Sequence, residues 1–164
     1  MADSEAFDGF YLASRDRLVL QVAALTGDPA EALDHVQEAF IRAWTRWDRI
    51  SAYDDPEGWV RRVAVNQAVS RWRRARRVVL RPAADVDRIH LDAEQQAVIV
   101  ALHRLRPRER EAVVLHHLIG YSVEEIATEL SVPTGTVKSW LSRGRARLER
   151  ELQADDEGVA HESR

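Results

Sequence analysis

Apolar residues recur at spacings of three and four along most of the chain, and no alternating run of strand length interrupts them. This pattern predicts an all-α protein without a sheet. The first helix should run from about Ser4 to Thr26, where Gly27 stops it, with a buried stripe made of Phe7, Phe10, Tyr11, Leu18, Val22 and Leu25.

An Asp-Pro pair, which can cap and start a helix, opens both the second and the third predicted helix. The second should run from Pro29 to near Ile50 and bury Val36, Phe40, Ala43, Trp44 and Trp47. A polar loop over residues 51–55 leads to the third helix, expected from Pro56 to Val79. That helix ends in Arg71, Arg73, Arg74, Arg76 and Arg77. At about 100° per residue these arginines point in nearly all directions, so this end should reach solvent or phosphates.

A second helical unit should follow a linker. Residues 81–92 contain Pro82, adjacent alanines and three aspartates without a sustained period, which is typical of a connection between domains. We therefore expect two small helical domains, a three-helix unit over residues 1–80 and a four-helix unit over 93–153. The four helices are expected at about 93–105, 107–118, 123–130 and 135–153. Residues 154–164 are acidic and patternless, which predicts a frayed tail.

Residues 120–150 have the pattern of a helix-turn-helix. Ser122 and Glu125 form a capping box, and Ser131 to Pro133 supply a turn. Thr134 can cap a second helix that packs through Val137, Leu141, Leu148 and Leu152. Its opposite side carries Lys138, Ser139, Ser142, Arg143 and Arg150. Hydroxyls and cations at the start of such a helix suit the DNA major groove, although an αα-hairpin with a polar solvent face has the same outline.

Composition limits the class of protein. The chain has 164 residues, 45% apolar and 31% charged, which is enough apolar surface for one or two modest cores. It has no cysteine, which excludes disulfide scaffolds, thiolate metal sites and cysteine nucleophiles. No apolar run approaches the roughly 20 residues of a membrane span, and the acidic N-terminus is unlike a signal peptide. We therefore expect a cytoplasmic protein.

Charge alternates in blocks along the chain. Residues 1–57 hold five basic and twelve acidic residues, whereas residues 58–84 hold eight arginines and no acid. Residues 104–150 are again net basic, with nine basic and six acidic residues. Arginine-rich blocks suit a polyanion and acidic faces suit a protein partner, although a basic block can also be a solvated helix end.

Nothing in the sequence points to catalysis. There is no glycine-rich phosphate loop, no nucleophile elbow and no carboxylate pair in an apolar setting. His116 and His117 are adjacent, so they diverge on a helix and lack a carboxylate at ligand spacing. We expect a non-enzymatic protein without a metal or another cofactor.

Three short motifs stand out: DHVQEAFIRAW over residues 34–44, YSVEEIA over 121–127 and VPTGTVKS over 132–139. They resemble the extracytoplasmic-function (ECF) group of bacterial sigma factors, small members of the sigma-70 family that keep only regions two and four. The likeness extends over about residues 7–152. His35 stands where the family usually has an aliphatic residue, and Leu33 where it usually has an acid.

The resemblance implies roles for residues in both units. The segment 34–44 would dock on the clamp helices of the largest polymerase subunit, through Asp34, Gln37, Glu38, Phe40 and Arg42. Residues 59–66 resemble the helix beside the minus-ten element, with single-strand contacts expected from Tyr53, Arg61, Arg62, Asn66, Arg71, Arg73 and Arg74. Contacts to the minus-thirty-five element are expected from Lys138, Ser139, Ser142 and Arg143, with Arg145 and Arg147 nearer phosphates. Of the tryptophans, Trp44, Trp47 and Trp59 are expected in the core.

The function implied is that of an alternative sigma factor, which binds core RNA polymerase, including its flap region, selects promoters and helps to melt the minus-ten region. An anti-sigma factor is implied as a further partner. Two other readings stay open: a dimeric helix-turn-helix regulator that binds duplex DNA alone, and a degenerate sigma that only titrates polymerase or an inhibitor. The basic face from Lys138 to Arg147 argues against the second.

Overall fold

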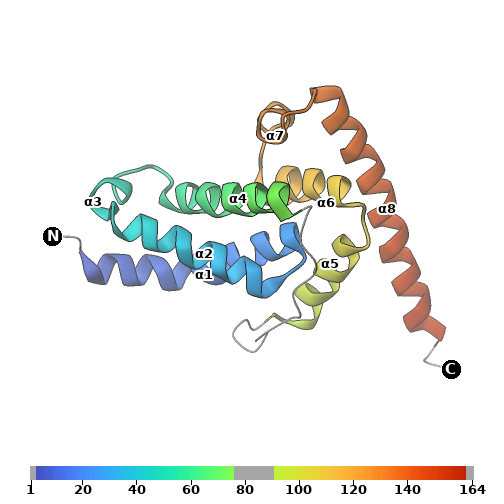
Figure 1. Ribbon diagram of the computed structural model, residues 1–164. Coiled ribbons are helices and arrows are strands. Elements are labelled where there is room, and N and C mark those ends of the chain that lie inside the picture. Colours follow the sequence, from blue (N-terminus) through green and yellow to red (C-terminus); the bar gives the residue numbers. More distant parts are fainter. Residues whose placement is uncertain (1–2, 76–90, 162–164) are drawn as a thin grey trace. The chain divides into compact units, whose positions relative to one another are not determined.

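Figure 1 shows the computed structural model, which describes the backbone of residues 3–75 and 91–161 and the side chains of 3–70 and 91–154. Every regular element in these ranges is a helix, which confirms the predicted all-α fold. The chain divides into two compact units, one up to Leu91 and one from Asp92 onward. Each unit is described by itself.

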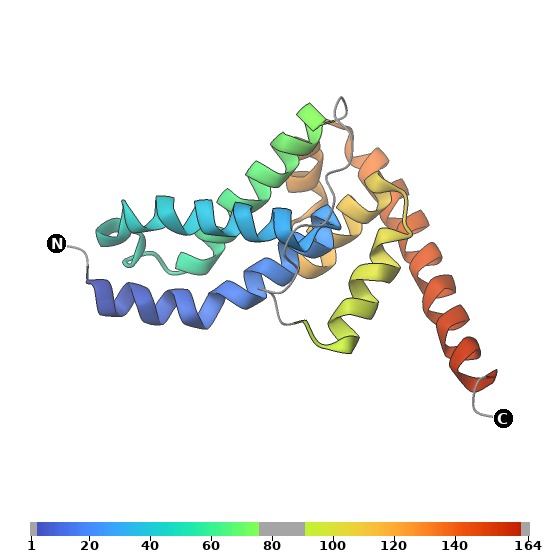
Figure 2. The ribbon, with the colours of Figure 1, turned by 60° about the horizontal axis from the view of Figure 1, so that its bottom comes forward.

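The first unit begins with two long helices whose ends are set by local sequence. Helix α1 spans Ser4–Thr26 and ends at Gly27, whose φ of 73° lies in the left-handed region and whose N–H donates to the Ala23 carbonyl. Helix α2 spans Pro29–Trp44, and the Asp28 carboxylate caps it by accepting from the first backbone N–H groups. The two helices lie side by side (Figures 1 and 2).

The second predicted helix is interrupted. It ends at Trp44, and the short helix α3, Trp47–Ile50, follows after a break at Arg46, where φ is −130° and ψ is 19°. The break turns Trp47 inward, where its side chain is 6% exposed and its ring stacks on Phe10 at 5.0 Å between centroids. Packing of this large side chain outweighs the continuation of the helix.

Aromatic rings fill the end of this unit where α1, α2 and α3 meet. Ring pairs at 4.8–6.4 Å between centroids join Phe7, Phe10, Tyr11, Phe40, Trp44 and Trp47. Trp44 belongs to this cluster but is 40% exposed, so the expectation that it is a core residue is wrong. Trp47 is buried as expected, and Trp59 is partly buried.

Helix α4, Pro56–Ala75, completes the first unit by packing on α1 and α2. It buries Val60, Ala64 and Val65 completely. Asp55 caps its start, because the Asp55 carboxylate accepts from the Gly58 N–H at 2.8 Å. The predicted end of this helix at Val79 lies outside the described residues, as does most of the predicted linker.

The second unit consists of α5 (Ala93–His103), α6 (Pro107–Val113), α7 (Val123–Leu130) and α8 (Thr134–His161). Capping boxes start α5 and α7. Two details differ from the sequence prediction. Helix α8 extends to His161, so the acidic segment expected to be frayed is helical to that residue, and Leu152, expected to pack, is 46% exposed.

A π-helical turn over Val114–Ile119 links α6 to α7. It ends at Gly120, whose φ of 89° favours glycine, and the Tyr121 N–H donates to the Leu115 carbonyl at 2.8 Å. The His116 Nδ1–H donates to the Tyr121 carbonyl at 2.8 Å, which fixes the tautomer of that ring. The turn therefore uses His116 structurally, and no metal-binding cluster occurs among the described side chains.

Helix α8 crosses α6 at very short range. A Cβ built on Gly144 would lie 2.7 Å from Val113 Cγ2 and 3.2 Å from the Glu109 carbonyl oxygen. Only a residue without a side chain permits this approach. The crossing therefore holds the middle of α8 directly against α6.

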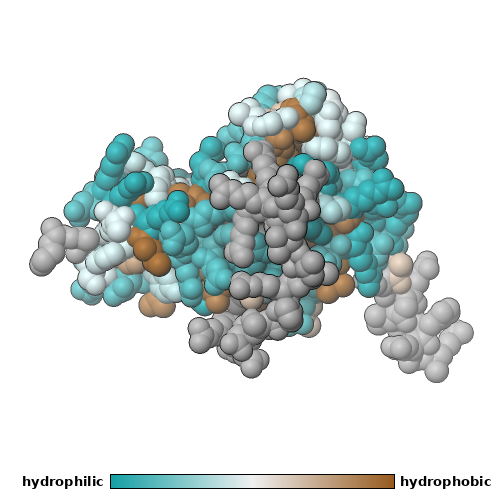
Figure 3. All heavy atoms as spheres, viewed as in Figure 1, coloured by the Kyte–Doolittle hydropathy of each residue, from teal (hydrophilic) through white to brown (hydrophobic). Residues whose placement is uncertain are grey.

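Few large apolar side chains are exposed over the described residues. They are Leu12, Ile41, Trp44, Tyr53, Val98, Val100 and Leu152. In the space-filling view the hydrophobic areas are small and separated by hydrophilic surface (Figure 3). None of the helices that the structure describes combines the length and apolarity needed to cross a bilayer.

Candidate nucleic-acid interface

Helices α7 and α8 form a compact helix-turn-helix. The turn between them contains Ser131, which has a positive φ of 54°, and the Val132 N–H returns to the Ala127 carbonyl at 2.9 Å. Helix α8 then begins at Thr134, which lies inside the first turn rather than before it. Ile126 of α7 and Val137 of α8 are fully buried, so the two helices share one apolar face.

The opposite side of α8 is polar and exposed. It carries Lys138, Ser139, Ser142, Arg143 and Arg145, which the sequence singled out. Val137 and Leu141 are buried on the other side, at 0% and 4% exposure, so one face packs while the other is open to a ligand. Short hydroxyls interleaved with long cations are suited to base edges and phosphates in a major groove.

A buried carboxylate lies beneath this basic face. Glu109 of α6 is 2% exposed, and its Oε2 lies 2.9 Å from Arg147 Nε. Its Oε1 lies 3.7 Å from Arg143 Nε. Two of the cations predicted to contact DNA are therefore tied to one acid of another helix. The sequence analysis missed Glu109, although helical spacing places it on the same face as the buried Ala112 and Val113.

Arg145 has different surroundings from its two neighbours. Its positive charge interacts electrostatically with His117 of the π-helical turn. Desolvation lowers the pKa of His117, and the charges of His116 and Arg145 lower this pKa further. The imidazole is therefore neutral at physiological pH, and it does not add to the positive charge of the surface.

In the first unit, the polar loop 51–55 and the start of α4 form a second candidate surface. Tyr53 is 37% exposed, and its backbone N–H donates to the Ile50 carbonyl at 3.0 Å. Arg62 is exposed on α4, and Asn66 lies one turn further along the same side. Asn66 is partly buried, and its Oδ1 is a buried acceptor without a hydrogen-bond partner. The side chains of Arg71, Arg73 and Arg74 lie outside the described residues.

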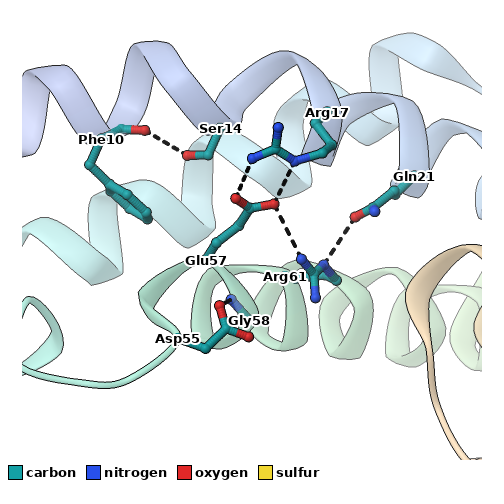
Figure 4. A network of polar contacts seen from close by, with 8 residues as sticks. All are labelled: Phe10, Ser14, Arg17, Gln21, Asp55, Glu57, Gly58 and Arg61. Atoms are coloured by element: carbon teal, nitrogen blue, oxygen red, sulfur yellow. Dashed lines mark hydrogen bonds and ion pairs between the residues drawn. The ribbon is translucent and has the colours of Figure 1, made fainter.

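Arg61 is held inside the unit. Its Nε donates to Gln21 Oε1 at 3.0 Å, and its Nη2 donates to Glu57 Oε1 at 3.2 Å (Figure 4). Arg17 of α1 donates to the same Glu57 carboxylate through two nitrogens. The hydrogen bond from Arg17 lowers the pKa of Glu57, which burial alone would raise. The Arg61 guanidinium therefore links α4 to α1, and its expected contact with a DNA strand stays a prediction.

Helix α2 presents a third surface. Asp34, Gln37, Glu38 and Arg42 are exposed, and Arg42 Nε donates to Glu38 Oε1 at 3.0 Å. Phe40, expected to contact polymerase, is 3% exposed. It packs edge-on against the ring of Tyr11 at 4.8 Å and is part of the core instead.

The apolar side chains that α2 does expose are Ile41, at 60%, and Trp44. Neither was among the predicted contacts, because the sequence pattern placed Trp44 in the core and gave no signal for Ile41. His35, at the position usually aliphatic, is buried at 6% exposure with its Nε2 3.3 Å from Glu31 Oε1.

Comparison with known proteins tests the resemblance. Residues 11–78 match the family model for sigma-70 region 2, and residues 95–148 match the model for sigma-70 region 4. The chain is 33% identical over 156 residues to the "RNA polymerase sigma-E factor" of Streptomyces avermitilis, covering 92% of this chain and 87% of the relative. A further relative, the "ECF RNA polymerase sigma factor SigM" of Mycobacterium tuberculosis, is 37% identical over 163 residues, or 96% of this chain and 82% of that protein. The chain belongs to the ECF sigma factors.

Solved structures of ECF sigma factors share the fold. The sigma factor RpoE of Bartonella quintana, in complex with the anti-sigma factor NepR, matches 92% of this chain and 99% of its own at a TM-score of 0.62 and 28% identity. The protein CnrH, in complex with the cytosolic domain of CnrY, matches at a TM-score of 0.55 and 26% identity over 93% of this chain and 91% of its own. This sigma factor therefore binds core RNA polymerase and directs it to promoters. Its family consists of specificity subunits.

Proposed function

We propose that this sigma factor recognises a promoter with two elements, reading the upstream one as duplex with α8 and capturing the downstream one as a single strand with α4 and loop 51–55. The observation that carries the proposal is the division of α8 into a buried apolar face and an exposed basic face. It favours DNA reading over an αα-hairpin with a polar solvent face, because cations and hydroxyls alternate at groove-reading positions.

At the upstream element, residue type assigns the roles. Lys138 and Arg143 can donate to guanine edges, and Ser139 and Ser142 can donate or accept at either base of a pair. Arg145 and Arg147 lie further along the helix and are assigned to phosphates, where they add affinity without sequence preference. Together they form the proposed minus-thirty-five contact surface.

At the downstream element, Tyr53, Arg62 and Asn66 supply three different functions. The phenol ring of Tyr53 can stack with an unpaired base, worth roughly 1–3 kcal/mol, and Arg62 can follow the strand's phosphates. The unpartnered Oδ1 of Asn66 is a buried acceptor that a base amino group would satisfy. Arg71, Arg73 and Arg74 remain predicted phosphate contacts, whereas Arg61 positions α4 through Glu57 and Gln21.

Polymerase docking is assigned to the exposed side of α2. Ile41 and Trp44 provide an apolar centre, and Asp34, Gln37, Glu38 and Arg42 provide a charged rim. This arrangement of apolar centre and polar rim is typical of protein interfaces. The sigma factor supplies specificity while polymerase performs the chemistry, so no catalytic group is assigned to this chain. It works where polymerase works, in the cytoplasm.

An anti-sigma factor is a further proposed partner. The related RpoE and CnrH are described in complexes with NepR and with the cytosolic domain of CnrY. The apolar surface that docks polymerase is suited to competition by such an inhibitor. Release of the inhibitor would then control promoter use.

Transcription in vitro tests the proposed function. Purified protein is added to bacterial core polymerase with sheared genomic DNA, and the transcript starts are mapped. New starts that share two upstream elements at constant spacing are expected. Specific duplex binding by the protein alone, without new starts, would instead identify a helix-turn-helix regulator.

A further inference from the structure

We infer that Glu109 is a positioning residue for promoter recognition, because its buried carboxylate orients the guanidinium groups of Arg143 and Arg147 toward DNA. The inference rests on the proposed reading of the upstream element by α8. It adds to that proposal a residue on a different helix that touches no DNA.

The two ion pairs hold both arginines near the acid without burying them. Arg143 Nε lies 3.7 Å from Glu109 Oε1, and Arg147 Nε lies 2.9 Å from Glu109 Oε2. Neither contact has hydrogen-bond geometry at Oε2, so the attraction that positions the two cations is that between opposite charges. Arg143 is 56% exposed at its side chain and Arg147 is 35% exposed, so both forks remain accessible to a ligand. An exposed guanidinium held near a buried acid keeps N–H donors available for a bidentate contact.

Charge explains why a carboxylate is needed at this place. Arg143 and Arg147 are four residues apart, so they are neighbours on one face of α8 and repel each other. A single acid near both offsets that repulsion by attracting each cation. Glu109 is 2% exposed, so its charge is poorly screened by water and acts strongly on the two cations.

The backbone ensures that the acid reaches both cations. Gly144 lies directly after Arg143, and its missing side chain lets α8 approach the Glu109 carbonyl oxygen and Val113. The Glu109 side chain therefore starts from beneath the middle of α8. Lys138 and Arg145 have no ion pair to Glu109, so the orientation applies to two of the basic residues only.

The test compares Glu109→Gln with Glu151→Gln in the full-length protein bound to core polymerase. Both variants remove one negative charge, but Glu151 is a partly exposed residue further along α8 that pairs with Arg104. Transcript yield is measured from a promoter mapped with the wild-type protein and from the same promoter with its upstream element scrambled. The ratio of the two yields reports recognition of the element. Polymerase binding and thermal unfolding are measured in parallel.

The expected result is a fall in the ratio of about fivefold or more for Glu109→Gln, the lower end of the discrimination of one bidentate contact. The ratio for Glu151→Gln should stay within about twofold of wild type. In an Arg143→Gln, Arg147→Gln background, Glu109→Gln should have no further effect on the ratio, since it acts through those two side chains.

An unchanged ratio for Glu109→Gln would overturn the inference, and so would an equal loss in the background that lacks both arginines. If Glu109→Gln does not fold, Glu109→Asp takes its place, because it keeps the charge and shortens the reach to the arginines. A ratio for Glu109→Asp equal to wild type would then overturn the positioning role. Failure of the wild-type protein to produce any promoter-dependent starts contradicts the proposed function instead, so the two failures are distinguishable.

Discussion

The close crossing of α6 and α8 makes opposite predictions for two glycines of the same helix. In Gly144→Ala, the new methyl group would lie 2.7 Å from Val113 Cγ2 and 3.2 Å from the Glu109 carbonyl oxygen. Carbon atoms prefer a separation of about 3.5–4.0 Å, so α8 or Val113 must move by roughly 1 Å. Val113 is 2% exposed and has little room to move. Gly135→Ala is the matched control, because nothing lies within 4 Å of its added methyl group.

The magnitudes follow from two opposing terms. Alanine is favoured over glycine within a helix by up to about 1 kcal/mol, and this term raises the free energy of unfolding in both variants. Overpacking of a close contact lowers it by about 1–3 kcal/mol in Gly144→Ala alone. The propensity terms largely cancel in the comparison, so the free energy of unfolding should be about 1–3 kcal/mol lower for Gly144→Ala than for Gly135→Ala.

Denaturant unfolding of the full-length variants, followed by circular dichroism, measures this difference. Gly135→Ala should match or exceed the wild-type protein. Adding Val113→Ala to Gly144→Ala should cost less than the sum of the two single changes, because the removed Cγ2 is the atom in conflict. Equal free energies of unfolding for the two alanine variants would refute the argument that the crossing requires a glycine.

Three other predictions concern the surfaces of the two units. Arg143→Ala should weaken binding to the upstream element by about 1–3 kcal/mol and leave polymerase binding intact, measured with fluorescent promoter duplex and with core polymerase; equal losses in both would contradict its assignment to DNA. Ile41→Asp should weaken polymerase binding at least tenfold in a titration. The control Leu12→Asp, which also replaces an exposed aliphatic residue by aspartate but on α1, should not weaken binding. Similar effects of the two variants would remove α2 from the docking surface. Glu57→Gln should flatten the pH dependence of stability. The pKa of Glu57 is lowered in the folded state, so its ionised carboxylate stabilises the wild-type fold above the unfolded pKa of about 4.5, and this stabilisation is lost as pH falls through the folded pKa. Thermal unfolding that is equally acid-sensitive in both proteins would argue against the Arg17–Glu57 link.

Local sequence was enough for several parts of this fold. The start of α1, its end at Gly27, the Asp-Pro start of α2 and the capping box of α7 all depend on residues within one turn of each other. The exposed basic face of α8 could be predicted for the same reason, since a helical period assigns side chains to faces. The family motifs lie in these same locally determined segments.

The predictions that were wrong concern contacts between elements far apart in the chain. Phe40 and Trp44 lie on one predicted stripe, but Phe7 and Tyr11 of α1 cover Phe40 while Trp44 stays partly exposed. The hydrogen bonds of Arg61 to Glu57 and to Gln21, which is forty residues away, were likewise not predicted. The spacing of apolar residues in one helix cannot show which side chains of another helix pack against them.

The sequence by itself determined where most helices begin and end, which face of α8 is apolar, and that the chain has sigma regions two and four. Those properties arise from interactions within a few residues. Only the tertiary structure decided that Gly144 brings α8 against α6 and that Glu109 lies buried beside Arg143 and Arg147. The physical reason is that burial and ion pairing depend on the distance between helices, which side-chain packing sets after the helices have formed.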